Sequence, residues 1–151
     1  MESILVQVMR PIFKPEDQNR AKFILYPYRI YHIKLLYKRL KMSDRVVDYF
    51  AYVDCYRFGV ERGDGIIEIQ EWKVPKDVIM SPNITEEEAR QKAVESAFNW
   101  GNLMVISWWT PKIEVVQEVE VYKVFWIFEK EGEVYVMDSL TGDKFKLKDL
   151  I

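Results

Sequence analysis

The sequence predicts an α+β protein in which one main helix, at about residues 85–100, packs on antiparallel sheet. Long runs rich in β-branched and aromatic residues, bounded by turn residues, lie at 23–40, 46–54 and 115–129. Only residues 85–100 instead carry apolar side chains at spacings of three and four. Hydrophobic residues make up 49% of the 151 residues, which is enough to bury a sizeable core.

The first half of the chain predicts strands. Residues 4–8 form a short strand, and residues 23–40 and 46–54 form an antiparallel hairpin around a loop at 41–44. A turn at 62–65 leads into a strand at 66–72. Residues 75–81 are the best linker candidate, because prolines stand near both ends. This divides one compact unit into a β-rich half, 1–74, and a helix-plus-hairpin half, 82–151.

The predicted helix has a defined start and a small-residue face. Thr85 and Glu88 match a capping box, in which each side chain satisfies the other's free backbone N–H. Alanines every fourth residue from Ala89 let the helix lie close to a sheet. Gly101 is expected to end the helix. Residues 103–109 then read as a strand, followed by strands at 115–129 and 134–138.

A near-repeat joins the two halves. Each hairpin ends in an Asp followed shortly by Gly, as Asp54 with Gly59 and as Asp138 with Gly142. In such turns the Asp side chain bonds to the backbone ahead of it and Gly supplies the left-handed position.

The helix pattern from Thr85 and the strands that end at Asp138 to Gly142 resemble a PepSY-like module over roughly residues 82–148. The first half looks like a degenerate second copy. The resemblance implies two cystatin-like helix-on-sheet halves. It also implies binding rather than catalysis, since such modules are mostly non-catalytic.

Composition indicates the expected cellular compartment and the kinds of site that the chain can form. Cys55 is the single cysteine, so no internal disulfide forms and a reducing compartment is expected. The N-terminal residues carry no secretory pattern and no run is long and apolar enough to span a membrane, so we expect a cytoplasmic protein without a membrane partner. Abundant Lys and Glu with few amides are typical of thermophiles. One His and one Cys support no transition-metal site, and no motif indicates a cofactor.

The first hairpin is basic and rich in tyrosine. Residues 1–45 hold ten Lys and Arg against four Asp and Glu. Basic side chains contact phosphates and aromatic faces stack bases, so nucleic-acid binding is one hypothesis. The alternative is a solvated hairpin whose tyrosines pack in the core. The candidate residues are Tyr28, Arg29, Tyr31, Lys34, Lys38 and Arg39.

A Cys–His pair is a further hypothesis. If the hairpin is centred between Met42 and Ser43, His32 pairs with Val53 and lies diagonal to Cys55 on one face. Such a pair can activate a thiolate, which would make a small enzyme. A one-residue slip puts the two side chains on opposite faces. A buried structural cysteine beside a hydrogen-bonded histidine is the competing interpretation.

Trp108 and Trp109 are candidate contact residues. Neighbours on a strand point to opposite sides, so either both sides are covered or one tryptophan is exposed. An exposed tryptophan is typical of a binding surface. The preferred hypothesis is a non-catalytic domain that binds a protein or peptide through a groove between sheet and helix or along an edge strand. Sheet edges or exposed aromatics could also join two copies in a homodimer.

Overall fold

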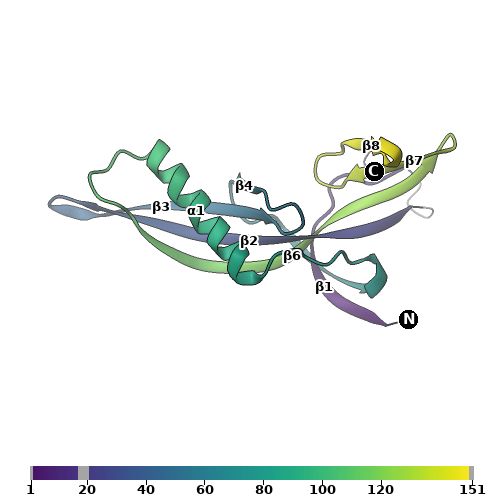
Figure 1. The fold of residues 1–151 in the computed structure, drawn as a ribbon, viewed down its shortest axis with the longest axis horizontal. Coiled ribbons are helices and arrows are strands. Elements are labelled where there is room, and N and C mark those ends of the chain that lie inside the picture. The colour runs from purple at the N-terminus through teal and green to yellow at the C-terminus, as the bar shows by residue number, and fades with distance from the viewer. Residues whose placement is uncertain (1, 17–20, 150–151) are drawn as a thin grey trace. The chain divides into compact units, whose positions relative to one another are not determined.

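The computed structural model describes residues 2–16 and 21–149 and confirms the α+β class. In this part of the chain one long helix follows five strands and precedes three more (Figure 1). The strands are β1 Ser3–Met9, β2 Lys22–Arg39, β3 Met42–Asp54, β4 Val60–Gly63, β5 Ile69–Pro75, β6 Lys112–Lys130, β7 Glu133–Asp138 and β8 Lys144–Lys146, and the helix is α1 Glu86–Met104. Short 3₁₀ turns lie at Lys76–Val78 and Leu147–Asp149.

The strands form a mixed sheet rather than a purely antiparallel one. Strand order is β4-β3-β2-β6-β1-β5, with β7 on β6 and β8 on β7. β1 runs parallel to β6, where Val8 pairs with Tyr122. The pairs β1–β5, β2–β3, β3–β4, β6–β7 and β7–β8 are antiparallel. A parallel pair needs a long connection, which a pattern of successive hairpins does not predict.

The chain divides into two compact units that each combine distant segments. The helix unit contains residues 28–66 and 82–120, and the terminal unit contains residues 1–27, 67–81 and 121–151. These units do not follow the linear division at residues 75–81. Instead β2 and β6 each contribute one part to either unit. The alternation of burial breaks in both strands near this point, between Ile30 and Tyr31 and between Val121 and Val124.

In the helix unit, β2 and β3 form a long hairpin with a tight turn. Arg39 pairs with Met42, and Lys41 in the turn has a φ of 57°. The predicted four-residue loop at 41–44 is therefore wrong, because the strands continue almost to the tip. The register follows from this turn and pairs His32 with Phe50 rather than with Val53.

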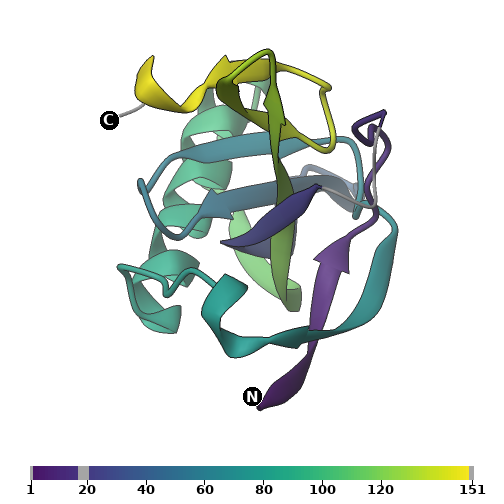
Figure 2. The ribbon, with the colours of Figure 1, turned by 90° about the vertical axis from the view of Figure 1, so that its right-hand side faces the viewer.

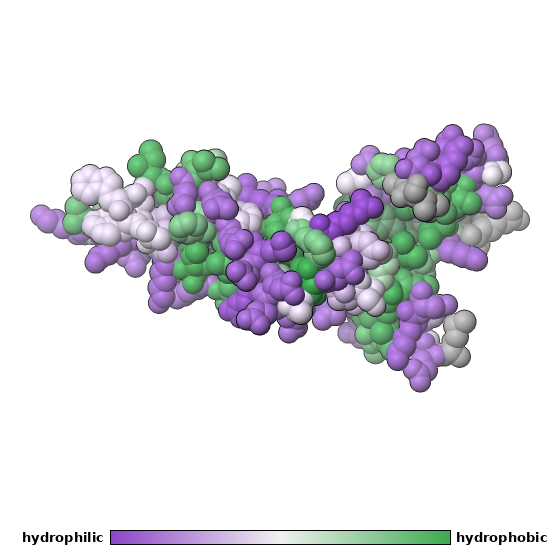
Figure 3. Space-filling view, viewed as in Figure 1, coloured by the Kyte–Doolittle hydropathy of each residue, from purple (hydrophilic) through white to green (hydrophobic). Residues whose placement is uncertain are grey.

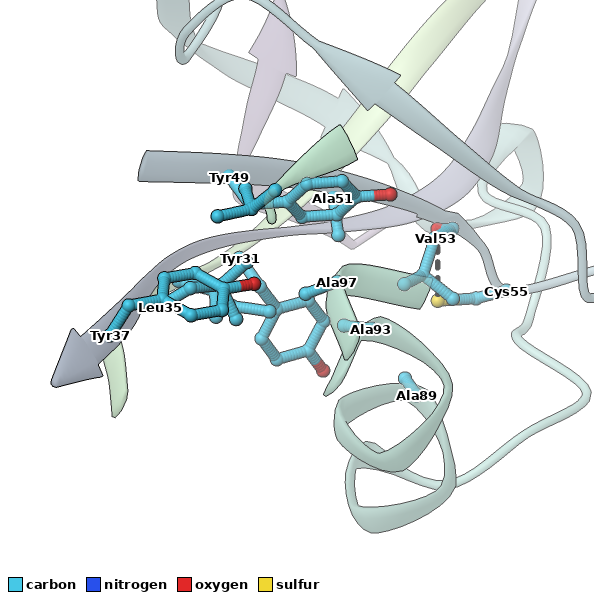
Figure 4. Close-up of a cluster of buried hydrophobic side chains, with 12 residues drawn as sticks. Tyr31, Leu35, Tyr37, Tyr49, Ala51, Val53, Cys55, Ala89, Ala93 and Ala97 are labelled. Atoms are coloured by element: carbon cyan, nitrogen blue, oxygen red, sulfur yellow. Dashed lines mark hydrogen bonds between the residues drawn. The ribbon is translucent and has the colours of Figure 1, made fainter. Parts of the chain in front are cut away.

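Helix α1 packs one small-residue face against β2 and β3 (Figure 4). Ala89, Ala93 and Ala97 are fully buried against a cluster that includes Tyr31, Leu35 and Tyr49. Methyl groups every fourth residue let the helix axis approach the sheet. The Thr85–Glu88 capping box is present as predicted, which fixes where the helix begins.

The predicted end of the helix at Gly101 and the strand at 103–109 are wrong. Gly101 lies inside the buried face of α1, which continues to Met104. A Cβ at position 101 would overlap the hydroxyl oxygen of Tyr37, so glycine permits close approach here rather than a stop. Residues 105–111 form a loop that no described strand pairs with.

The terminal unit has its own core. Trp126 and Trp72 lie around Phe23, with ring centroids 6.0 and 5.5 Å from it. Residues 75–81, the predicted linker, contain the end of β5 and a 3₁₀ turn, and Ile79 forms a bridge to Leu25. Figure 2 shows this segment beside β1. The segment packs on the core instead of spanning open space.

The two Asp turns share one hydrogen-bond pattern. Oδ1 of Asp54 accepts from the amides two and three residues later, and so does Oδ1 of Asp138. In both turns the Asp carbonyl accepts from the residue four positions on, which has φ of 73° at Phe58 and 79° at Gly142. The left-handed residue of the first turn is therefore Phe58 and not Gly59, which corrects the predicted alignment by one residue.

Candidate docking surface

Most of the predicted basic and aromatic set lies inside the fold. The Arg29 side chain is 11% exposed and forms ion pairs with Glu86 at 3.1 Å, Glu120 at 3.5 Å and Glu118 at 3.7 Å. Tyr31 is fully buried and accepts a hydrogen bond from Arg29 Nε at 3.0 Å. This network joins β2, β6 and the first turn of α1.

The ionisation of this pair follows from burial and contact. Burial raises the pKa of the Tyr31 hydroxyl, and the neighbouring Arg29 offsets part of that rise. Burial by itself would lower the pKa of Arg29, but the hydrogen bond to Tyr31 and the nearby carboxylates hold it above its ordinary value. Arg29 therefore remains a structural cation at neutral pH.

The remaining predicted hairpin residues separate along β2. Tyr28 is half-buried opposite Asp54, and Lys34 is half-buried opposite Asp48. Only Lys38 and Arg39 lie at the turn end of the hairpin.

Cys55 and His32 lie on opposite faces of the hairpin. His32 Nε2 is 2.8 Å from Asp48 Oδ1, and its ring stacks on Phe50 with centroids 4.4 Å apart. Cys55 instead packs under α1, where burial raises the pKa of its thiol to about 11. The predicted juxtaposition is wrong because the true register differs by an odd number of residues.

The described residues bear on two further features, namely metal sites and membrane-spanning helices. Within residues 2–16 and 21–149, no group of three or more His, Cys, Asp and Glu side chains could hold a metal ion. No helix among them is both long and apolar enough to cross a membrane.

The structure brings Trp108 and Trp109 to Lys38 and Arg39. These four residues line an open groove of about 340 Å³ in the helix unit, between the end of the β2–β3 hairpin and the loop after α1. We call this groove and its rim the tip surface, formed by Tyr37, Lys38, Arg39, Leu40, Arg45, Val105, Ile106, Ser107, Trp108 and Trp109. Two features that the sequence presents 70 residues apart thus meet at one place.

Local contacts hold the two sides of the groove. On the loop side, Val105 packs into the core and its amide donates a hydrogen bond to the Gly101 carbonyl. Ser107 Oγ accepts from the Trp109 amide at 3.2 Å and donates to its carbonyl at 3.1 Å. On the hairpin side, Arg39 Nε donates to the Ser43 carbonyl at 2.8 Å. Both sides of the groove therefore contain backbone groups held by local hydrogen bonds.

The tip surface exposes large apolar side chains beside cations. Ile106 is 98% exposed, Trp108 87% and Leu40 67%. Leu103, Met104 and Met42 next to them are also exposed. Figure 3 shows pale and green residues among purple ones at the turn end of the hairpin. Exposed apolar side chains gathered beside a groove make the tip surface a candidate interaction site.

The predicted strand at 103–109 is wrong, yet in the loop that takes its place Trp108 is largely exposed and Trp109 is partly exposed. Sequence reasoning missed Leu40, Met42 and Ile106. A signal for the first two was present, because loops normally carry polar residues, whereas Leu40 borders the predicted loop at 41–44 and Met42 lies within it. Nothing comparable marked Ile106, which belonged to an apolar run read as a buried strand.

Comparisons with models of protein families, with curated proteins and with solved structures found no match for this chain.

Proposed function

We propose that this protein is a non-catalytic binding domain that docks an acidic, aromatic-containing peptide segment of a partner protein on the tip surface. The observation that carries the proposal is the exposure of Trp108 and Ile106 beside a groove lined by Lys38, Arg39 and Arg45. Tryptophan is a frequent anchor of protein interfaces, and an apolar groove gives a partner's ring a place to bury.

The charge of the rim favours an acidic partner. Lys38, Lys41 and Arg45 surround the turn, and none forms an ion pair with another described residue. Asp44 is the single acid of the segment 38–45. Carboxylates that flank an aromatic residue would complement this rim, which speeds association and selects against basic partners. The groove volume of about 340 Å³ suits a bulky side chain rather than a large cofactor.

The relationship to PepSY-like modules belongs to this proposal. It is supported by α1 packed on antiparallel strands and by the two Asp turns with the same hydrogen bonds. Modules of that kind mostly bind rather than catalyse.

A peptide display experiment tests the proposal. Peptides of twelve random residues are selected on the full chain and their affinities measured by fluorescence polarisation. We expect selected peptides to carry Asp or Glu around an aromatic residue. Trp108→Ser combined with Ile106→Ser should weaken binding by about tenfold or more, which is the usual effect of removing interface anchors.

The matched control is Leu5→Ser, which removes another exposed apolar side chain in the terminal unit. It should leave peptide affinity unchanged. Fluorescent oligo-dT and vesicles of phosphatidylcholine with phosphatidylserine serve as competing probes. If either binds in a Trp108-dependent manner while no peptide is selected, the peptide proposal is overturned. Nucleic acid or an anionic lipid surface then takes its place.

A further inference from the structure

Strand β5 is an edge strand of the sheet. It pairs with β1 from Ser3–Pro75 to Met9–Ile69, and no other described strand pairs with it. Its residues alternate, with Trp72 and Val74 turned to the core and Glu71 and Lys73 exposed. Figure 2 shows β5 next to β1. An unpaired edge of seven residues can accept a further strand.

The backbone groups of β5 that point outward can be assigned. The Arg10 amide donates to the Glu68 carbonyl at 2.9 Å, in the same register as the β1–β5 pairing. Hydrogen-bonded and non-hydrogen-bonded pairs alternate in an antiparallel ladder. The even-numbered residues of β5 therefore bond to β1, and Glu71 and Lys73 turn their N–H and C=O outward. Pro75 belongs to the outward set, as expected of proline in an edge strand.

We propose that this edge pairs in antiparallel fashion with β5 of a second copy of the chain, about a twofold axis at Trp72. In a symmetric antiparallel pair, residues that lie opposite each other point to the same face of the sheet. One residue therefore lies opposite its own copy, and the twofold axis lies between these two copies. With the axis at Trp72, Glu71 lies opposite Lys73 of the second copy, and Lys73 lies opposite its Glu71. An axis at Glu71 or at Lys73 would instead place like charges opposite each other.

Charge and hydrogen bonding select the same register. Residues 71 and 73 carry the outward backbone groups, so each Glu–Lys pair also exchanges two backbone hydrogen bonds. Neither side chain forms an ion pair with another described residue, so both are available to the second copy. Cross-strand pairs of opposite charge stabilise a sheet, and like charges destabilise it. Because one strand edge buries little area, the dimer should be weak and concentration-dependent.

Sedimentation equilibrium of the full chain over a concentration series tests the proposal. The unaltered chain should dimerise. Glu71→Lys alone, or Lys73→Glu alone, places like charges opposite at two positions and should weaken dimerisation by about tenfold. The double variant Glu71→Lys with Lys73→Glu exchanges the two charges, restores complementarity and should restore the original dissociation constant.

Two controls keep the result decisive. Glu61→Lys makes the same charge change on the exposed face of β4, another edge strand, and should leave dimerisation unchanged. Circular dichroism shows whether each variant is folded. A chain that stays monomeric at every concentration overturns the proposal. So does a folded double variant that fails to regain the dimer, or a dimer that Glu71→Lys does not weaken.

Discussion

At the scale of single residues, Cys55 acts as a small apolar residue under α1. It is 2% exposed, and burial raises the pKa of its thiol to about 11. In the unfolded chain a cysteine ionises near pH 8.5. The folded state thus retains a proton that the unfolded state loses between these two values. The free energy of unfolding should therefore fall as pH rises from about 8.5 to 11, by up to roughly 3 kcal/mol from this thiol.

The comparison of the unaltered chain with Cys55→Ala measures that contribution. Urea unfolding at pH 7, and at several values up to about pH 10.5, gives the slope of stability against pH for each protein. Burial also raises the pKa values of Tyr31 and Tyr37, but both proteins share those groups. The variant should show the smaller slope, whatever its stability at pH 7. Equal slopes would contradict the buried-thiol interpretation, as would rapid native labelling by a thiol reagent at neutral pH.

Phe58 adopts a backbone conformation that suits glycine. Its φ is 73°, at the position where the Asp138 turn has Gly142 with φ 79°. The left-handed region costs a residue with a bulky side chain roughly 1–2 kcal/mol. Phe58→Gly should therefore stabilise the protein by up to about 1 kcal/mol after loss of its partial packing. The Lys92 ammonium lies 5.9 Å from the Phe58 ring centroid, and this contact is lost.

Gly59→Ala is the matched control for this turn. Gly59 does not have a positive φ, and no atom lies within 4 Å of where a Cβ would stand. The substitution should leave the thermal unfolding midpoint within the small range of surface changes. If Phe58→Gly lowers the midpoint, the ring contributes more than the strained backbone costs.

At the scale of the element, the close approach of α1 to β2 depends on Gly101 and Tyr37. A Cβ at 101 would overlap the Tyr37 hydroxyl oxygen and would lie 3.1 Å from Leu35 Cδ1. That hydroxyl is buried without a hydrogen-bond partner among the described residues. Gly101→Ala should destabilise the protein by about 1–3 kcal/mol, despite the better helix propensity of alanine.

Tyr37→Phe removes the overlapping oxygen and should cost little stability, because it also removes an unsatisfied polar group. In the Tyr37→Phe background, Gly101→Ala should therefore cost markedly less than in the unaltered chain. A double-mutant cycle from urea unfolding gives this coupling directly. Additive effects would mean that the helix end moves away from β2 without strain.

The elements that the sequence predicts well are those set by local chemistry. The capping box at Thr85 fixed the start of α1, and the alanine spacing identified its buried face. The predicted helix end was wrong because Gly101 was taken as a local stop signal. Glycine stands there because the helix approaches Tyr37 of β2 closely, which is a tertiary contact. The predicted hairpin register was also wrong. The turn at Lys41 is tighter than the predicted loop, and this changes every residue pair along β2 and β3.

At the scale of the whole molecule, the candidate site and the units both depend on long-range contacts. Lys38, Arg39, Trp108 and Trp109 could be selected from the sequence as types of residue suited to binding. Their meeting at one groove could not be predicted, because it requires the path of the chain between residues 39 and 105. The two units could not be predicted from sequence order either, because each combines segments from both sides of residues 75–81.

The discontinuous units predict how the divided chain behaves. The fragment 1–74 contains the β2–β3 hairpin without α1, whose alanine face covers Tyr31 and Leu35. The fragment 82–151 contains α1 and β6 without β2 and β3, so that face has no sheet to pack on. Each fragment also holds only part of the terminal unit. Either fragment alone should therefore show no cooperative thermal unfolding, because neither contains a complete core.

Mixing the two fragments should restore helix content and a cooperative transition, seen by circular dichroism and by dispersed amide signals in NMR spectra. The bonds that assemble the two cores are non-covalent, so the recovered stability should rise with fragment concentration. If fragment 82–151 folds cooperatively by itself, the linear halves are independent domains and α1 finds its packing surface on β6 and β7. If the mixture stays unfolded, the connection through residues 75–81 is itself required. Ile79, which bridges to Leu25, is then the first residue of that segment to substitute.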